Sequence, residues 1–188
     1  MLNLNWPNRL SLYRIITAPV FVICLIYYRP ENDYLRVIAI FIFLSAMASD
    51  AIDGIIAKAT SQKTALGAFL DPLADKLLIN SGFICLSLIT NLPAQIKFPV
   101  WVPIIVIMRD LIIVAGSLVI HILTSALKIT PSVLGKLTTF FQMTAIIAVL
   151  FQYNRASYLW NMAVIFTVFS GVDYMLKGLR FLNDNAKR

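Results

Sequence analysis

Long apolar runs constrain this chain more than any other feature of its sequence. Several of them reach the roughly 20 residues that an α-helix needs to cross about 30 Å of hydrocarbon. Hydrophobic residues make up 60% of the 188 residues and charged residues only 13%, whereas soluble domains are roughly 45–50% apolar and about 25% charged. The sequence therefore predicts an all-α, polytopic integral membrane protein, and it disfavours a water-soluble fold.

Polar and proline-containing breaks between the apolar runs predict six transmembrane helices. The predicted ranges are 8–28, 34–58, 64–90, 98–123, 131–151 and 156–181. With short connections, we expect a single membrane domain over residues 1–188. An even number of spans puts both termini on one side, which also receives most of the lysines and arginines. The positive-inside rule makes this side cytoplasmic.

Three reactive side chains and the net charge have ordinary explanations. Cys24, Cys85 and His121 lie inside apolar runs, where such side chains usually pack, so we expect neither a disulfide nor a metal site from them. The formal net charge of +7 comes from basic residues scattered between the spans. This scatter indicates topology signals and no nucleic-acid partner.

The acidic residues have an unusual distribution. Six of the nine fall within predicted spans: Asp50, Asp53, Asp71, Asp75, Asp110 and Asp173. A charged aspartate near the bilayer centre costs at least about 2.5–3.5 kcal/mol, so an intramembrane carboxylate indicates a functional site.

Four of these carboxylates form two helix-spaced pairs. Asp50 and Asp53 are three residues apart, and Asp71 and Asp75 are four apart, so each pair occupies one helix face. Carboxylates that converge would repel one another unless divalent cations lay between them, and oxygen-only ligands favour Mg²⁺ or Mn²⁺. The alternative is a set of separate hydrogen bonds between helices by protonated aspartates.

The residues around the two pairs form a longer pattern, Asp50-x2-Asp53-Gly54-x2-Ala57-Lys58-x8-Gly67-x3-Asp71-x3-Asp75. This pattern resembles the signature of the CDP-alcohol phosphotransferase family. Pro7-Asn8 with Arg14 and the later Gly135-Lys136-x2-Thr139-x2-Gln142 are also similar to family segments. The resemblance covers nearly the whole chain.

The resemblance implies six helices around a cavity open to the cytoplasm, in a homodimer of the bacterial inner membrane. It also implies two divalent cations, Mg²⁺ or Mn²⁺, on Asp50, Asp53, Asp71 and Asp75, with Asp75 as the general base. The reaction would transfer the phosphatidyl group of CDP-diacylglycerol to an alcohol and release CMP. The implied CDP-diacylglycerol contacts are Asn8, Gly54, Ala57, Lys58, Thr64 and Gly67.

Two positions depart from the family pattern. Lys58 stands where the family usually has arginine. The positive charge is therefore kept, but the planar guanidinium that can donate two parallel hydrogen bonds is not. Ser117 stands where glycerophosphate-using members have a second arginine, eight residues after Arg109. Glycerol 3-phosphate remains the preferred acceptor, with Arg109 and Lys136 as its ligands, and phosphatidylglycerol is the alternative, which would make cardiolipin.

Two further alternatives remain open. Arg109 within its span either grips the acceptor phosphate or forms an internal pair with Asp110 or Asp173 that ties helices together. Intramembrane carboxylates also line the ion paths of divalent-cation transporters. A transporter would place them at several depths, whereas these four pair at one level.

Overall fold

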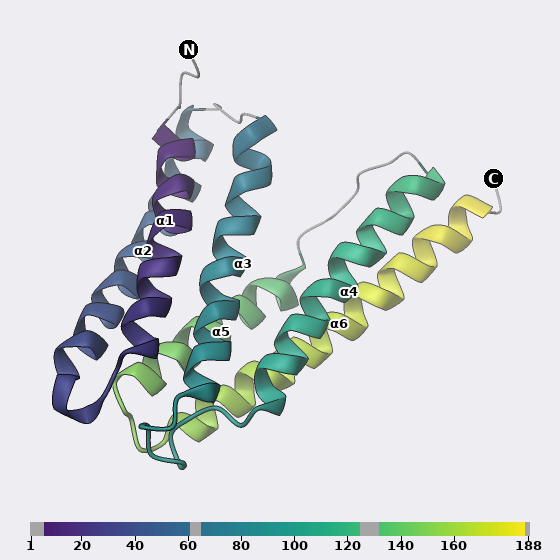
Figure 1. Ribbon diagram of the computed structural model, residues 1–188. Helices are drawn as coiled ribbons and strands as arrows, with labels where there is room; N and C mark the ends of the chain where they lie inside the picture. The colour runs from purple at the N-terminus through teal and green to yellow at the C-terminus, as the bar shows by residue number, and fades with distance from the viewer. Residues whose placement is uncertain (1–5, 61–64, 125–131, 187–188) are drawn as a thin grey trace. The chain divides into compact units, whose positions relative to one another are not determined.

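The computed structural model describes residues 6–60, 65–124 and 132–186 of the backbone. Side chains are described except at 6–9, 51, 53–60, 65–72, 121, 123–124 and 184–186. The described chain is helical (Figure 1): α1 (Trp6–Ile26), the short 3-10 helix η1 (Pro30–Asn32), α2 (Asp33–Thr60), α3 (Ala65–Leu88), α4 (Trp101–Thr124), α5 (Val133–Leu150) and α6 (Ala156–Ala186). The six predicted helices are all present, most with ends within two or three residues of the prediction.

Helices α1, α2 and α3 belong to a first compact unit, residues 1–97. Within it α1 packs against both α2 and α3, and the three helices lie side by side in Figure 1. The core between α1 and α2 contains Phe21 and Phe43, both fully buried, with ring centroids 5.5 Å apart. This packing sets α1 beside the half of α2 that leads to Asp50.

Helices α4, α5 and α6 belong to a second compact unit, residues 98–188. Within it α6 packs against both α4 and α5. Phe141 of α5 stacks on Phe166 of α6 with ring centroids 4.6 Å apart. Trp101 and Trp160 meet edge to face at 5.6 Å where α4 and α6 begin, as expected for aromatic residues that share one membrane interface.

Four helical segments are long and apolar enough to cross a membrane, judged over the described residues: 30–50, 101–120, 133–150 and 156–183. The apolar part of α1, residues 10–26, is shorter. Helix α3 is not among the four, and it carries Asp71, Asp75 and Lys76 in its first half. The chain is thus an all-helical protein with several candidate membrane spans.

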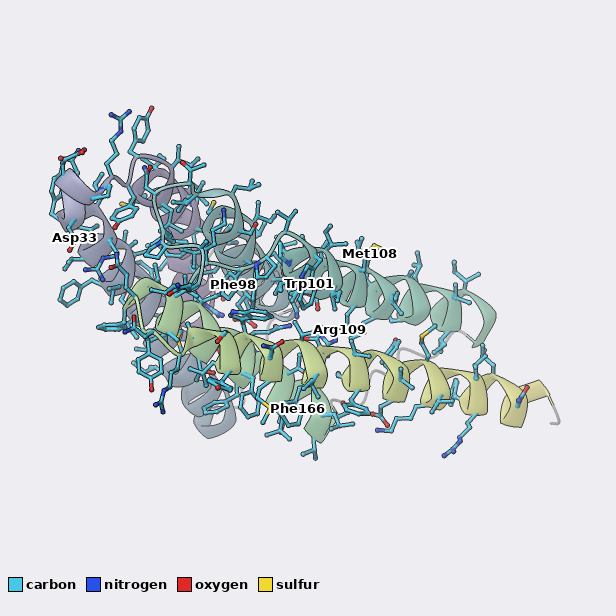
Figure 2. All side chains as sticks on the ribbon, turned by 90° about the horizontal axis from the view of Figure 1, so that it is seen from below. Asp33, Phe98, Trp101, Met108, Arg109 and Phe166 are labelled. Carbon is cyan, nitrogen blue, oxygen red and sulfur yellow. The ribbon has the colours of Figure 1, made fainter. Side chains whose placement is uncertain are left out.

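Helix α4 has an exposed apolar face and a second face that packs within the second unit. Met108 and Leu111 are more than half exposed, whereas Arg109 and Asp110 between them are buried. Figure 2 shows Met108 on the outer side of α4 and Arg109 on the side that α6 covers. Exposed apolar side chains suit contact with lipid, and the two charged side chains are shielded from it.

Candidate active site

The first carboxylate pair lies on α2. Asp50 and Asp53 are three residues apart within this continuous helix, so the predicted sharing of one face holds for their backbone positions. The Asp50 side chain is 44% exposed. The side chain of Asp53 lies outside the described residues.

Asp50 is held from α1 by an arginine that was not among the predicted site residues. Nη1 of Arg14 donates to Oδ1 of Asp50 at 2.6 Å, and the Arg14 side chain is only 1% exposed. One residue earlier on α1, the Tyr13 hydroxyl hydrogen-bonds to that of Ser45 on α2 at 2.8 Å. The signal available in the sequence was a lone arginine within an apolar run, which is costly in a membrane without a partner.

The second carboxylate pair lies on α3. Asp71 and Asp75 are four residues apart within this helix. Asp75 lies one turn before Ile79, which is fully buried, and the Asp75 side chain is itself partly buried. Asp75 therefore occupies the buried side of α3, while the side chain of Asp71 is outside the described residues.

The donor chemistry of these positions fits a divalent cation. Among described side chains no group of three or more carboxylate, imidazole or thiol side chains comes together. Of the four aspartates, only Asp50 and Asp75 have described side chains. Both are carboxylates with at least partial access, one on α2 and one on α3. Oxygen donors of this kind suit Mg²⁺ or Mn²⁺.

The residues expected to contact CDP-diacylglycerol are described only in part. Asn8 lies in the first turns of α1, Gly54, Ala57 and Lys58 follow Asp53 on α2, and Gly67 lies at the start of α3. Their side-chain surroundings, and Thr64 altogether, lie outside the described residues. Their contact with the nucleotide stays a prediction.

Arg109 is enclosed within the second unit. Its Nη1 donates to Oδ1 of Asp110 at 2.9 Å, and its Nη2 donates to Oγ of Ser170 on α6 at 2.6 Å. The internal pair with Asp110 that the sequence left open is thus present. Asp173 pairs with Lys177 at 2.6 Å.

The first turn of α5 approaches the same guanidinium. A Cβ placed on Gly135 would lie 3.6 Å from Nη2 of Arg109 and 3.3 Å from Oγ of Ser132. Ser132 caps this helix, since its Oγ accepts from the backbone N–H of Gly135 at 3.0 Å. Lys136, the next residue, has an exposed side chain. The fold therefore brings the two predicted acceptor ligands to neighbouring segments, Arg109 buried and Lys136 open.

A cavity of about 230 Å³ lies close to this turn within the second unit. Its lining includes Ser132 of the α5 cap, Ile120 of α4, and Asp173, Tyr174 and Lys177 of α6. The cavity is therefore bordered by polar groups from α6 and the α5 cap.

The sequence as a whole is similar to those of known proteins. The sequence matches the CDP-alcohol phosphatidyltransferase family over residues 4–170. It is 34% identical to "Probable phosphatidylglycerophosphate synthase" of Mycobacterium tuberculosis, over 94% of this chain and 82% of that protein.

Two further relatives are similar over nearly their whole length. Both bear the name CDP-diacylglycerol–glycerol-3-phosphate 3-phosphatidyltransferase. The protein of Haemophilus influenzae is 34% identical over 97% of this chain and 98% of its own length, and that of Bacillus subtilis is 31% identical over 92% and 94%. The chain belongs to the CDP-alcohol phosphatidyltransferase family of enzymes.

Proposed function

We propose that this enzyme is a phosphatidylglycerophosphate synthase. It transfers the phosphatidyl group of CDP-diacylglycerol to glycerol 3-phosphate and releases CMP. The observation that carries this proposal is the similarity, at 31–34% identity over almost the whole chain, to relatives that are named for this reaction. The complete pattern from Asp50 to Asp75 is present in the sequence and agrees with it.

The proposed cofactor is a pair of divalent cations, Mg²⁺ or Mn²⁺, held by Asp50, Asp53, Asp71 and Asp75. When bound, such ions neutralise a diphosphate and favour in-line attack at phosphorus. The protein contributes carboxylates from α2 and α3. The half-exposed carboxylate of Asp50 supports this assignment.

Asp75 is the proposed general base. Its carboxylate takes the proton from the acceptor hydroxyl as the hydroxyl oxygen attacks the phosphorus on the lipid side of the diphosphate, and the bond to CMP breaks. Its position on the buried side of α3, with a partly buried side chain, supports this role. Asn8, Gly54, Ala57, Lys58, Thr64 and Gly67 are the proposed contacts of CDP-diacylglycerol.

Arg109 and Lys136 are the proposed ligands of the acceptor phosphate. A phosphate dianion is best bound by charge-assisted hydrogen bonds. Lys136 is exposed at the start of α5, close to the segment that contacts Arg109. In this proposal Asp110 and Ser170 fix the direction of the Arg109 guanidinium.

The wider architecture is part of the same proposal. We infer a single domain over residues 1–188 with six transmembrane helices around a cavity open to the cytoplasm. The enzyme would act as a homodimer in the inner membrane, with both termini on the cytoplasmic side. The four apolar spans and the excess of basic residues on one side of the predicted topology support this arrangement.

Cardiolipin formation from phosphatidylglycerol is the second candidate. It is favoured by Ser117, which is uncharged where glycerophosphate-using members of the family have a second arginine. The Ser117 hydroxyl donates to the carbonyl of Val114 at 2.8 Å. The sequence arrangement of Pro131-Ser132 and Lys136 also resembles that of eukaryotic-type cardiolipin synthases of the same family. Ser132, however, serves as the cap of α5, so this serine has a structural explanation that is independent of the acceptor.

The reaction class is tested by CMP release. Purified protein with CDP-diacylglycerol, glycerol 3-phosphate and Mg²⁺ or Mn²⁺ is expected to release CMP, and chelation of the metal should stop the release. The same protein in sealed vesicles is expected not to carry Mn²⁺ across the membrane. Metal transport without CMP formation would identify a transporter and overturn the enzyme proposal.

A further inference from the structure

Arg14 is the most deeply buried charged side chain among the described residues, with 1% exposure, and nothing in the proposed reaction uses it. A guanidinium in the middle of an apolar helix is costly unless a partner compensates its charge. Nη1 of Arg14 donates to the Asp50 carboxylate at 2.6 Å. A buried cation on α1 thus reaches the first carboxylate of the motif on α2.

The two ends of this contact differ in their surroundings. Arg14 is enclosed, whereas the Asp50 side chain is 44% exposed. The arginine therefore holds the carboxylate from the protein interior, and the carboxylate keeps an open side. A carboxylate with that exposure on an isolated helix would sample several rotamers, and a charge-assisted hydrogen bond to a buried donor restricts them.

The packing of α1 against α2 holds Arg14 in place. The hydrogen bond between Tyr13 and Ser45 joins α1 to α2 about one turn before Asp50. Phe21 and Phe43 join the same two helices further along. The Arg14 guanidinium is therefore placed by packing and not by Asp50 alone.

We propose that Arg14 is a positioning residue that orients the Asp50 carboxylate for binding a divalent cation. This inference depends on the proposed metal site. Residues that orient a metal ligand through a hydrogen bond usually change metal affinity by about 10- to 100-fold when they are removed. A guanidinium also repels a cation, so the sign of the change separates the two effects. Orientation predicts weaker metal binding without Arg14, and simple charge compensation predicts tighter binding.

The test measures Mn²⁺ binding to purified protein without substrate, by the loss of the electron paramagnetic resonance signal of free Mn²⁺. Arg14→Gln is expected to raise the dissociation constant about 10-fold or more. Arg14→Lys keeps the positive charge but loses the planar guanidinium. This variant should raise the dissociation constant by a smaller factor, about threefold.

Two control variants separate orientation from general damage to the helix pair. Tyr13→Phe removes a second polar contact between α1 and α2, the hydrogen bond to Ser45. Arg36→Gln removes an arginine–aspartate pair, Arg36 with Asp33 at 2.7 Å, where α2 begins. Both controls should bind Mn²⁺ like the unaltered protein. Thermal unfolding in excess chelator shows which variants are folded.

Each outcome has a defined meaning. If the unaltered protein binds no Mn²⁺, the proposed metal site is wrong. If it binds Mn²⁺ and the folded Arg14→Gln protein binds equally or more tightly, the role of Arg14 is wrong and the metal site stands. Should Arg14→Gln not fold, Arg14→Lys decides, and Mn²⁺ binding at least as tight as that of the unaltered protein would contradict the proposal.

Discussion

Nη2 of Arg109 on α4 donates to Oγ of Ser170 on α6 at 2.6 Å, within the second unit. Ser170 is 1% exposed and Arg109 is 9% exposed. The contact joins two packed helices and also fixes one edge of the guanidinium. Its consequence for the reaction depends on whether Arg109 binds the acceptor phosphate or only ties the helices.

Ser170→Ala is expected to raise the KM for glycerol 3-phosphate roughly 2- to 10-fold, because one hydrogen bond that directs Arg109 is lost. Arg109→Ala should raise it more, roughly 10- to 100-fold, and Lys136→Ala should act in the same direction. The KM for CDP-diacylglycerol should change less in all three. Ser117→Ala is the control, because the Ser117 hydroxyl donates to a carbonyl of its own helix. Equal effects on both substrates would assign Arg109 to helix packing.

Gly135→Ala tests how closely α5 must approach Arg109. The added methyl would lie 3.3 Å from Oγ of Ser132, which is tight, and 3.6 Å from Nη2 of Arg109, which is an ordinary contact, so the cap would have to shift beside the guanidinium. We expect a severalfold higher KM for glycerol 3-phosphate. Gly178→Ala on α6 meets only Ile120, at 3.5 Å, which is an ordinary contact, and should leave the KM unchanged. Steady-state kinetics of the two variants make the comparison.

The motif aspartates should be indispensable. Asp50→Asn, Asp53→Asn and Asp71→Asn are each expected to lower turnover by orders of magnitude, because a metal that loses a ligand no longer positions the diphosphate. Asp75→Asn should be among the worst, with a loss of about 100- to 10,000-fold for a general base. Turnover is measured by CMP release from protein shown to be folded. A folded Asp75→Asn enzyme with near-normal turnover would remove the base assignment.

Substitutions of Lys58 test whether the positive charge or the planar guanidinium geometry of arginine matters beside the diphosphate. Lys58→Arg should stay active, since it restores the side chain that the family pattern usually has. Lys58→Ala should raise the KM for CDP-diacylglycerol roughly 10-fold, because a charged hydrogen-bond donor is lost. An unchanged KM in Lys58→Ala would mean that this lysine serves only membrane topology.

The helices were predictable because a helix that crosses a membrane needs a long apolar run, whereas the connections between helices are polar. The largest error is at the end of α6, which continues to Ala186 although the prediction stopped at residue 181. The prediction ended where polar and charged residues become frequent. A helix leaving the hydrocarbon needs no apolar face, and neither glycine nor proline interrupts residues 179–186.

The site was predictable only where its residues are close in sequence. The spacing of Asp50 with Asp53, and of Asp71 with Asp75, follows from helix periodicity alone. The partner of Asp50 lies 36 residues away on α1, and a pairing over that distance depends on which helices pack together. Ser170 gave no signal either, since a serine within a transmembrane helix often bonds only to its own backbone.

The acceptor is the central claim, and identification of the lipid product tests it most directly. Purified protein receives CDP-diacylglycerol and the metal, with glycerol 3-phosphate in one reaction and phosphatidylglycerol in another. Our proposal predicts phosphatidylglycerophosphate and an equal amount of CMP in the first reaction, and no cardiolipin in the second. Cardiolipin from phosphatidylglycerol, with no product from glycerol 3-phosphate, would contradict it.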